Sequence, residues 1–167
     1  MVMKGKIFHN PTLGKLTLNQ VSKEVAAFIK ADHQCFYRLV IGSDSQEKRL
    51  NGKKELSLVG AIVIHRLGKG GRYFYRKEKR RQPPSIRQKI YTETLFSLEI
   101  ASKFLPTLNK ILNGKKLYEL EIHIDVGRAG KTREMIKEVV GMVSGNGFTA
   151  KTKPESYGAS KVADKHT

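Results

Sequence analysis

The sequence predicts an α/β protein with one mixed sheet of about five strands and helices packed against it. Three apolar segments between residues 36 and 80 are separated only by short polar turns, which predicts an antiparallel meander of three strands. After residue 85 the strand patterns alternate with helical patterns, which is typical of strands added in parallel to an existing sheet. The length of 167 residues suits one such core.

A helix is expected at about residues 17–31, ahead of the first strand. Thr17 and Gln20 have the spacing of a capping box, in which the two side chains satisfy backbone amides at the start of a helix. Apolar residues then fall on one helical stripe: Leu18, Val21, Val25, Phe28 and Ile29. We expect residues 1–34 to be an N-terminal extension with this extra helix and residues 35–167 to be the sheet domain.

The meander is expected to occupy the next fifty residues. The stretch "FYRLVIGSDSQ" (36–46) is rich in aromatic and β-branched residues, and this strand is expected to end at its glycine and polar cluster. Residues 55–80 are expected to form a hairpin around the "GKGG" turn at 68–71. Pro83 and Pro84 then end the sheet, because proline cannot donate to a strand ladder.

The second half of the chain predicts helices and strands in turn. Ser85 begins a long helical pattern that Pro106 is expected to end or kink. The alternating stretch 117–125 predicts a strand, and residues 132–147 predict a helix closed by Gly-Asn-Gly. The expected buried side of that helix consists of Ile136, Val139, Val140 and Val143. Two short elements complete the pattern, a strand at 148–154 and a helical stub at 159–167.

The charge balance indicates a polyanionic partner. Lysine and arginine number 32 against 15 aspartate and glutamate residues, which gives a formal net charge of +17 at pH 7. Such an excess most often attracts nucleic acid, although a basic surface without a partner has the same composition. Cys35 is the only cysteine, and no segment has the length of a signal-peptide core or a membrane span. We therefore expect a cytoplasmic protein that binds nucleic acid.

The stretch "IDVGRAGKT" ends like a phosphate-binding loop but does not have its spacing. That loop requires G-x-x-x-x-G-K-[ST], because the first glycine lets backbone N–H groups wrap around the phosphates. Counting back from Gly130, the first glycine would have to be residue 125, which is an aspartate. We therefore expect a turn in which Thr132 helps to cap the following helix. Lys131 can contact a phosphate without any nucleotidase activity.

Four acids occupy conspicuous places in a chain with few aspartates. Asp44 is expected to follow the first strand of the meander, Asp125 to end the fourth strand at 117–125, and Asp164 to lie in the C-terminal stub. Glu93 is expected near the start of the long helix. Each acid alone fits a turn or a solvated helix face, but gathering carboxylates is unfavourable unless cations bind them. Hard divalent ions such as Mg²⁺ take oxygen ligands, so the order of the acids favours a metal site.

The order of these acids resembles the ribonuclease H-like superfamily, and more narrowly the YkuK family of uncharacterised bacterial proteins with that fold. The similar segments are "IGSDSQ", "YTETLFSLE", "HIDVG" and "SKVADKHT", within about residues 36–167. The last is similar to the N-x-x-A-D segment of many ribonucleases H, with Ser160 in place of Asn. Only three residues follow Asp164, a departure from the longer late helix of that family.

The resemblance implies a ribonuclease H-like fold and a two-metal nuclease site. The implied catalytic and metal-ligating residues are Asp44, Glu93, Asp125 and Asp164, and the implied cofactor is two Mg²⁺ or Mn²⁺ ions about 3.5–4 Å apart. The implied reaction hydrolyses a phosphodiester bond in RNA or DNA and leaves a 3′-hydroxyl. Glu99 is the rival acid on the helix, but its spacing of six residues turns it away from the face of Glu93. His166 is open as a ligand or proton-transfer group, beside the simpler interpretation of a frayed terminal residue.

A basic stretch between the hairpin and the long helix supplies candidate contacts to phosphates. Those candidates are Lys77, Lys79, Arg80, Arg81, Arg87 and Lys89, together with Lys131. Their contribution to binding should fall with salt. Tyr73 and Tyr75 can stack on bases, although strand aromatics more often pack within a fold. Three functions stay open: a nuclease, a nucleic-acid-binding protein that does not cut, and a small-nucleotide hydrolase that uses the same acids.

Overall fold

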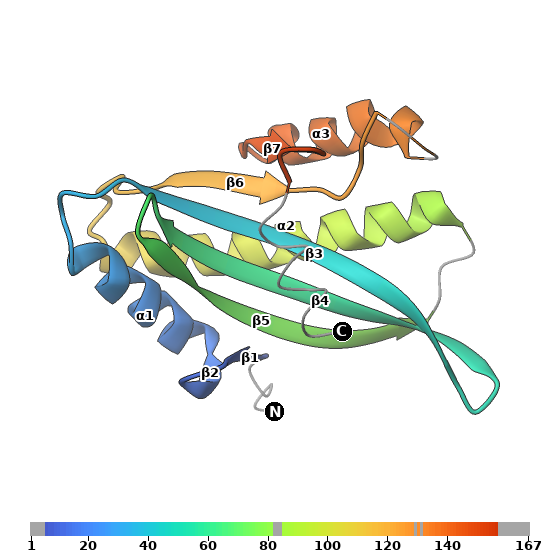
Figure 1. Cartoon of the computed structure of the whole chain (residues 1–167), viewed down its shortest axis with the longest axis horizontal. Helices are drawn as coiled ribbons and strands as arrows, with labels where there is room; N and C mark the ends of the chain where they lie inside the picture. Colours follow the sequence, from blue (N-terminus) through green and yellow to red (C-terminus); the bar gives the residue numbers. More distant parts are fainter. Residues whose placement is uncertain (1–5, 82–84, 129, 131, 157–167) are drawn as a thin grey trace.

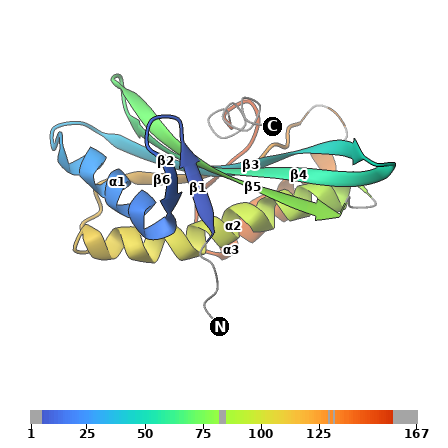
Figure 2. The same cartoon turned by 90° about the horizontal axis from the view of Figure 1, so that it is seen from below.

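A mixed sheet of seven strands forms the centre of the structure, a computed structural model that describes residues 6–81, 85–128, 130 and 132–156. The strands are β1 (Ile7–Asn10), β2 (Gly14–Thr17), β3 (Tyr37–Leu50), β4 (Lys53–Arg66), β5 (Gly70–Arg81), β6 (Glu119–His123) and β7 (Ala150–Lys151). The helices are α1 (Leu18–Lys30), α2 (Ile86–Ile111), the 3₁₀ turn η1 (Arg133–Met135) and α3 (Ile136–Gly145). The three α-helices lie on one face of the sheet (Figures 1 and 2). We call the other face, on which the described residues place no helix, the open face.

The order of the strands confirms the predicted topology and corrects the predicted number. From one edge to the other the order is β2-β1-β5-β4-β3-β6-β7. Strands β3, β4 and β5 form the antiparallel meander, and β6 and β7 are added in parallel, as predicted. The sheet has seven strands and not five, because β1 and β2 extend it beyond β5.

The unpredicted strands form a hairpin in the N-terminal segment, where only a helix was expected. Each has four residues, too few for a pattern of alternating hydrophobicity to stand out. The turn between them is specified locally, because the Asn10 side chain accepts hydrogen bonds from the backbone N–H groups of Thr12 (2.9 Å) and Leu13 (2.8 Å). Gly14 closes the turn with a φ of +76°. Beside β5, His9 pairs with Tyr75 and so attaches the hairpin to the meander.

Strand β3 is longer than predicted and does not end at its polar cluster. It pairs residue by residue with β4, from Tyr37 opposite Arg66 to Leu50 opposite Lys53. The polar residues stay in the ladder because backbone hydrogen bonds do not depend on side-chain polarity. The sequence did contain the signal for this longer hairpin: Asn51 and Gly52 both have positive φ, as the tight turn requires.

Helices α1 and α2 begin where the sequence predicted. Thr17 Oγ1 accepts from the N–H of Gln20 (3.2 Å) and Gln20 Oε1 accepts from the N–H of Thr17 (2.8 Å), which completes the predicted capping box. Ser85 caps α2, since its hydroxyl accepts from the N–H of Gln88 (3.2 Å). Pro106, however, lies inside α2 and does not end it. The missing hydrogen bond costs about 3 kcal/mol, but Leu105 and other buried residues beside it hold this part of the helix against the core.

Gly60 lets α2 approach the sheet closely. A Cβ atom at this position of β4 would lie 2.4 Å from Ile100 Cδ1 and 2.5 Å from Phe96 Cε1, both on α2. Gly60 also pairs with Ser43 on β3. The close approach therefore occurs beside the part of β3 that carries Asp44, and it brings the start of α2 to that strand.

The last described helix is preceded by a loop that the sequence only partly predicted. Met135, Val139 and Val143 are buried, whereas Ile136 and Val140 are half-buried. Thr132 does not cap the helix, since its hydroxyl accepts from the N–H of Gly127 (3.3 Å) and closes the loop after β6. The Gly-Asn-Gly stop and the short parallel strand are present as predicted. Pro83, Pro84 and the C-terminal stub lie outside the described residues.

Candidate functional site

Three of the predicted acids come together beside the end of β6. Asp44 lies within β3 and not after it, Glu93 lies near the start of α2, and Asp125 follows β6. The parallel ladder between β3 and β6 ends where Gly42 lies opposite His123. Asp44 and Asp125 are each two residues beyond that pair. Because parallel strands advance in the same direction, the two aspartates reach the same level of the sheet.

Asp125 is the central residue of a three-residue turn. The N–H of Val126 donates to the carbonyl of Ile124 (2.9 Å), a turn that is common at the ends of strands. The last residue of β7 and the segment after it fix this turn on both sides. The N–H of Ile124 donates to the carbonyl of Lys151 (2.9 Å), and the N–H of Lys153 donates to the carbonyl of Val126 (2.8 Å). The turn thus holds the Asp125 carboxylate at the end of the sheet.

Glu93 reaches the underside of β3 and is held there by serines. Ser45 Oγ donates to Glu93 Oε1 (2.5 Å), and Ser43 Oγ donates to the Glu93 backbone carbonyl (2.5 Å). Ser97 Oγ donates in turn to Ser43 Oγ (2.9 Å). Since side chains alternate along a strand, Ser43 and Ser45 face α2 while Asp44 points toward the open face. These serines were not among the predicted site residues, although their alternation around Asp44 was the signal that places them together.

The buried carboxyl of Glu93 binds its proton unusually strongly. Glu93 is 4% exposed. Burial raises its pKa to about 8, and the negative charges of Asp44 and Asp125 act in the same direction. The hydrogen bond from Ser45 and the positive charge of Lys89 lower the pKa but are outweighed. At pH 7 the carboxyl is therefore mostly protonated, and a cation among these acids would favour its ionisation.

Lys153 already places a positive charge among the acids. Its Nζ lies 2.9 Å from Asp125 Oδ1. The hydrogen bond to Asp125 raises the pKa of Lys153, and the charges of Asp44 and Glu93 raise it further. No signal in the sequence distinguishes this lysine from the other basic residues, because only the pairing of the β7 segment with the Asp125 turn brings it here.

The chemistry of the acids suits a divalent metal, although they do not form a ready-made cage. Carboxylate oxygens are the ligands that Mg²⁺ and Mn²⁺ prefer. Within the described ranges, no three histidine, cysteine, aspartate or glutamate residues are arranged to hold a metal ion. Asp164, the fourth implied ligand, and His166 lie outside those ranges. In the structure the cation beside Asp125 is the ammonium of Lys153.

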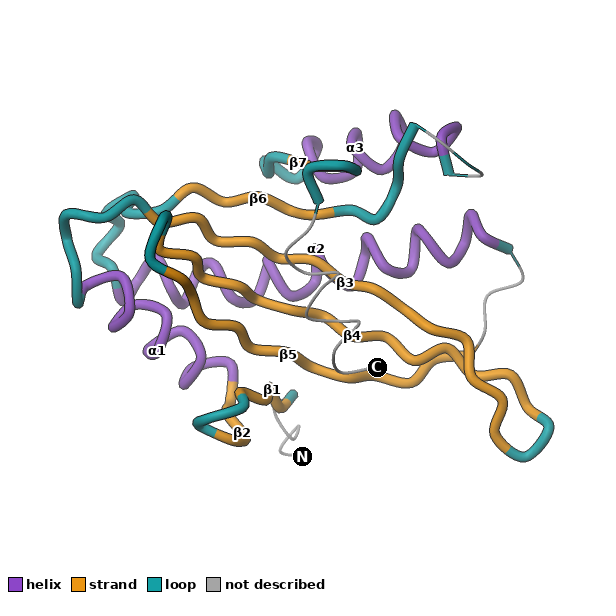
Figure 3. Tube along the Cα trace, viewed as in Figure 1, coloured by secondary structure: helices purple, strands orange, loops and turns teal. Residues whose placement is uncertain are grey.

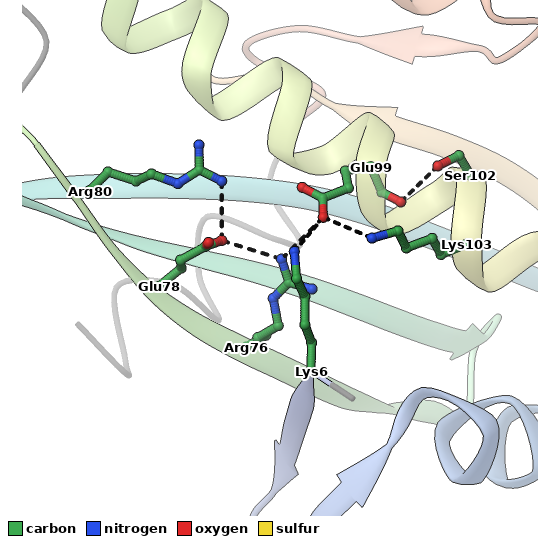
Figure 4. A network of polar contacts seen from close by, with 7 residues as sticks. All are labelled: Lys6, Arg76, Glu78, Arg80, Glu99, Ser102 and Lys103. Atoms are coloured by element: carbon green, nitrogen blue, oxygen red, sulfur yellow. Dashed lines mark hydrogen bonds and ion pairs between the residues drawn. The ribbon is translucent and has the colours of Figure 1, made fainter. Parts of the chain in front are cut away.

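Glu99, the rival acid on the helix, belongs to a separate ionic network (Figure 4). Its Oε1 lies 2.5 Å from Lys6 Nζ, 3.1 Å from Lys103 Nζ and 3.9 Å from Arg76. The hydrogen bond from Lys6 is the main reason that the pKa of Glu99 falls to about 2. Glu99 thus links the N-terminal hairpin and β5 to α2, and Glu93 is the helical acid that lies with Asp44.

The predicted phosphate contacts do not share one surface. Phe74 belongs to the core beneath the helices, so alternation along β5 places Lys77, Lys79 and Arg81 on the open face. Arg80 lies on the helix side, where it pairs with Glu78 (3.3 Å).

The other basic candidates lie on α2 or outside the described residues. Arg87 forms an ion pair with Glu138 of α3, whereas the charge of Lys89 acts on Glu93. Lys131 is among the residues whose positions are not described. Of the two predicted stacking residues, Tyr75 lies against the ring of His9, with centroids 5.5 Å apart. None of the helices in the described part of the chain is long and apolar enough to cross a bilayer.

Comparison with known proteins gives one family and one relative. The model of a family described as ribonuclease H-like matches residues 20–167. The uncharacterized protein YkuK of Bacillus subtilis (strain 168) is 32% identical over 171 residues, which cover 96% of this chain and 96% of the relative. No solved structure matches.

Proposed function

Since this chain belongs to the ribonuclease H-like family, we propose that it is a metal-dependent nuclease that hydrolyses phosphodiester bonds in RNA or DNA. The family itself indicates a nuclease or another nucleic-acid-related function. One observation carries the finer proposal: the charges of Asp44 on β3 and Asp125 after β6 both act on Glu93 of α2, in a chain with a net charge of +17. A protein that only bound phosphates would gain nothing from gathering carboxylates there.

In this proposal the acids hold Mg²⁺ or Mn²⁺. Asp44, Glu93 and Asp125 are the described ligands, and the family resemblance adds Asp164. When bound, two such ions supply an activated water and stabilise the leaving oxygen of the phosphodiester. Metal binding needs the ionised form of Glu93, so its proton leaves while Ser45 continues to donate to the carboxylate. The hydrogen bonds from Ser43 and Ser45 keep Glu93 oriented throughout.

Lys153 acts next to the metal ligands. Its ammonium neutralises Asp125 in the metal-free protein, and its aliphatic chain packs against Gly127, where an added Cβ would lie 3.1 Å from Lys153 Cβ. With a metal ion held by Asp125, the Lys153 ammonium would be released from its ion pair and could donate to a phosphate of the substrate. The segment after β7 therefore contributes a group that binds the substrate beside the point of cleavage.

The experiment that tests the nuclease is cleavage of a labelled panel: RNA–DNA hybrid, single-stranded RNA, duplex DNA and a four-way DNA junction. Each is incubated with Mg²⁺ or Mn²⁺ and the native chain, Asp44→Asn or Asp125→Asn. Glu99→Gln is the matched control, because it removes a carboxylate of the same helix that lies outside the site. We expect metal-dependent cutting that both aspartate variants lose and the control retains. Binding without cutting, unchanged in either aspartate variant, would refute the proposal.

A second function, nucleic-acid binding without cleavage, is favoured by one contact. The ion pair of Lys153 with Asp125 occupies a carboxylate that a metal would need. If Lys153 is a permanent structural partner, adding Mn²⁺ will leave the chain's thermal stability unchanged. A nuclease site that takes up metal would instead raise the melting temperature with increasing Mn²⁺.

A further inference from the structure

A line of basic side chains on the open face starts beside Asp44 and follows the β3–β4 hairpin. We call it the cation track and define it by its members: Lys48, Lys53, Lys77, Lys79 and Arg81. Along one row of the sheet, Asp44 lies opposite Val59 and Val59 lies opposite Lys77. Neighbouring strands are about 4.8 Å apart, so roughly 10 Å separates the backbones at Asp44 and Lys77. The track therefore begins next to the acid site.

The register puts the members of the track on one face. Leu56 and Leu58 belong to the core beneath the helices, so the odd-numbered residues of β4, including Lys53, face the other way. Lys79 lies opposite Ser57, and Arg81 and Lys48 both lie opposite Glu55. The neighbouring basic residues Arg76 and Arg80 are on the helix side, over the ring of Phe96 at 4.7 and 6.0 Å. These five side chains belong together because the strand register places them on the same face, and not merely because they are basic.

The track leaves the body of the sheet on a projecting arm. The ladder from β3 to β6 ends at Gly42, and that from β4 to β5 ends at the pair of Glu55 with Arg81. The rest of the β3–β4 hairpin projects past these partners (Figure 3). Lys48 and Lys79 line a shallow hollow of about 470 Å³ on this arm, together with Arg49, Leu50, Glu55 and Ser57. Glu55 is the one acidic residue among the six that line the hollow, and three of the others are basic, so the hollow is predominantly positive.

The length of the track sets the size of the anion that fits it. Six residues separate Asp44 from Leu50, which pairs with Lys53, and at 3.3 Å per residue they span about 20 Å. A nucleic-acid strand in a helix advances 3.4 Å per phosphate, so 20 Å corresponds to about six nucleotides. A mononucleotide at the acids would not reach the end of the arm.

We propose that the cation track binds the phosphate backbone of a nucleic-acid substrate that extends at least about six nucleotides from the acid site. This inference rests on the proposed function, since it takes the acids as the point of cleavage. It assigns Lys48 and Lys53 to substrate binding beside the strand residues Lys77, Lys79 and Arg81. It also excludes a small nucleotide as the natural substrate, because a short anion would leave the arm unused.

The arm offers a matched pair of variants for the test. Lys48→Gln with Lys53→Gln removes two charges from the open face. Lys54→Gln with Arg80→Gln removes two charges from the helix side of the neighbouring strands β4 and β5, at positions that do not line the hollow. Both double variants have the same net charge and exposed substitutions in the meander. Binding of labelled RNA and DNA strands of 4, 8 and 16 nucleotides, and of a 16-base-pair RNA–DNA hybrid, is measured by fluorescence anisotropy with EDTA present.

The expected result is a loss that depends on both face and length. The open-face variant should bind the 16-nucleotide strands or the hybrid about tenfold more weakly at 100 mM salt, with a salt slope smaller by about 1.5. Its deficit relative to the opposite-face variant should disappear for the 4-nucleotide strands. Equal losses of affinity in the two variants, or equal binding of 4- and 16-nucleotide strands by the native chain, would refute the proposal that the cation track binds the substrate backbone. These outcomes are independent of the cleavage panel, whose failure would overturn the nuclease alone.

Discussion

The protonation of Glu93 gives a prediction about stability that can be worked out in full. Its pKa is about 8 in the folded protein against 4.5 for an ordinary glutamate. Below pH 4.5 the side chain is neutral in both states and costs nothing. As the pH rises from 4.5 to 8, the unfolded chain ionises while the folded protein keeps its proton, so the free energy of unfolding falls. Above pH 8 both states are ionised and the loss is complete.

Glu93→Gln removes this loss, because glutamine stays neutral and its amide oxygen still accepts from Ser45. One pKa unit corresponds to 1.36 kcal/mol, so between pH 5 and pH 9 the native chain should lose about 4 kcal/mol of stability relative to the variant. That is a large part of the 5–15 kcal/mol by which domains are usually stable. The measurement is urea unfolding followed by circular dichroism at unit steps of pH, with EDTA to remove divalent ions.

Glu99→Gln is the control on the same helix. The pKa of Glu99 is lowered to about 2, so the stabilisation by its ion pairs is lost only as the pH falls from 4.5 toward 2. Its effect should be the same at every pH from 5 to 9. A difference between native chain and Glu93→Gln that changes by less than about 1 kcal/mol over this range would refute the reasoning, since it would mean that Glu93 is ionised when folded.

Three further predictions concern the metal, the lysine and the packing of α2. Because Mn²⁺ must displace the Glu93 proton, the affinity of the protein for Mn²⁺ should rise with pH up to about 8 and then level off. Calorimetry at pH 7 in buffers of different ionisation enthalpy should detect the release of about one proton for each Mn²⁺ bound. Lys153→Gln should bind Mn²⁺ roughly fivefold more tightly in the same titration, because a competing charge is gone from a partly exposed pair; weaker binding would show that the lysine assists the metal. Gly60→Ala should lower the free energy of unfolding by about 1–3 kcal/mol through its clash with Phe96 and Ile100, whereas Gly141→Ala, on α3 with open space around it, should raise stability by up to about 1 kcal/mol.

Local signals in the sequence were sufficient for the starts of α1 and α2 and for the order of strands β3 to β7. The capping box at Thr17, the cap at Ser85 and the alternation around Ile122 each depend on neighbours within a few residues. The N-terminal hairpin was missed because its strands have four residues each, although Asn10 specifies the turn. Pro106 does not end α2, because burial against the core outweighs one lost hydrogen bond.

The candidate site also combines features that the sequence predicted with features that only the structure shows. The order of Asp44, Glu93 and Asp125 along the chain, and its resemblance to a family, could be read without coordinates. The protonation of Glu93 could not, because its pKa depends on burial beneath β3 and on charges that lie 49 residues before it and 32 after it in the chain. Lys153 could not be chosen either, since it reaches Asp125 only through the parallel pairing of the segment after β7.

The sequence by itself determined the α/β class, the meander followed by parallel strands, the basic charge and the order of the acids from which a site is predicted. These are properties of residue type and local spacing, and they do not change with the environment of a side chain. Only the tertiary structure decided that the buried Glu93 keeps its proton, that Lys153 accompanies the aspartates, and that the basic residues divide between two faces. Those properties arise from strand register and burial, which bring together groups that the chain keeps far apart.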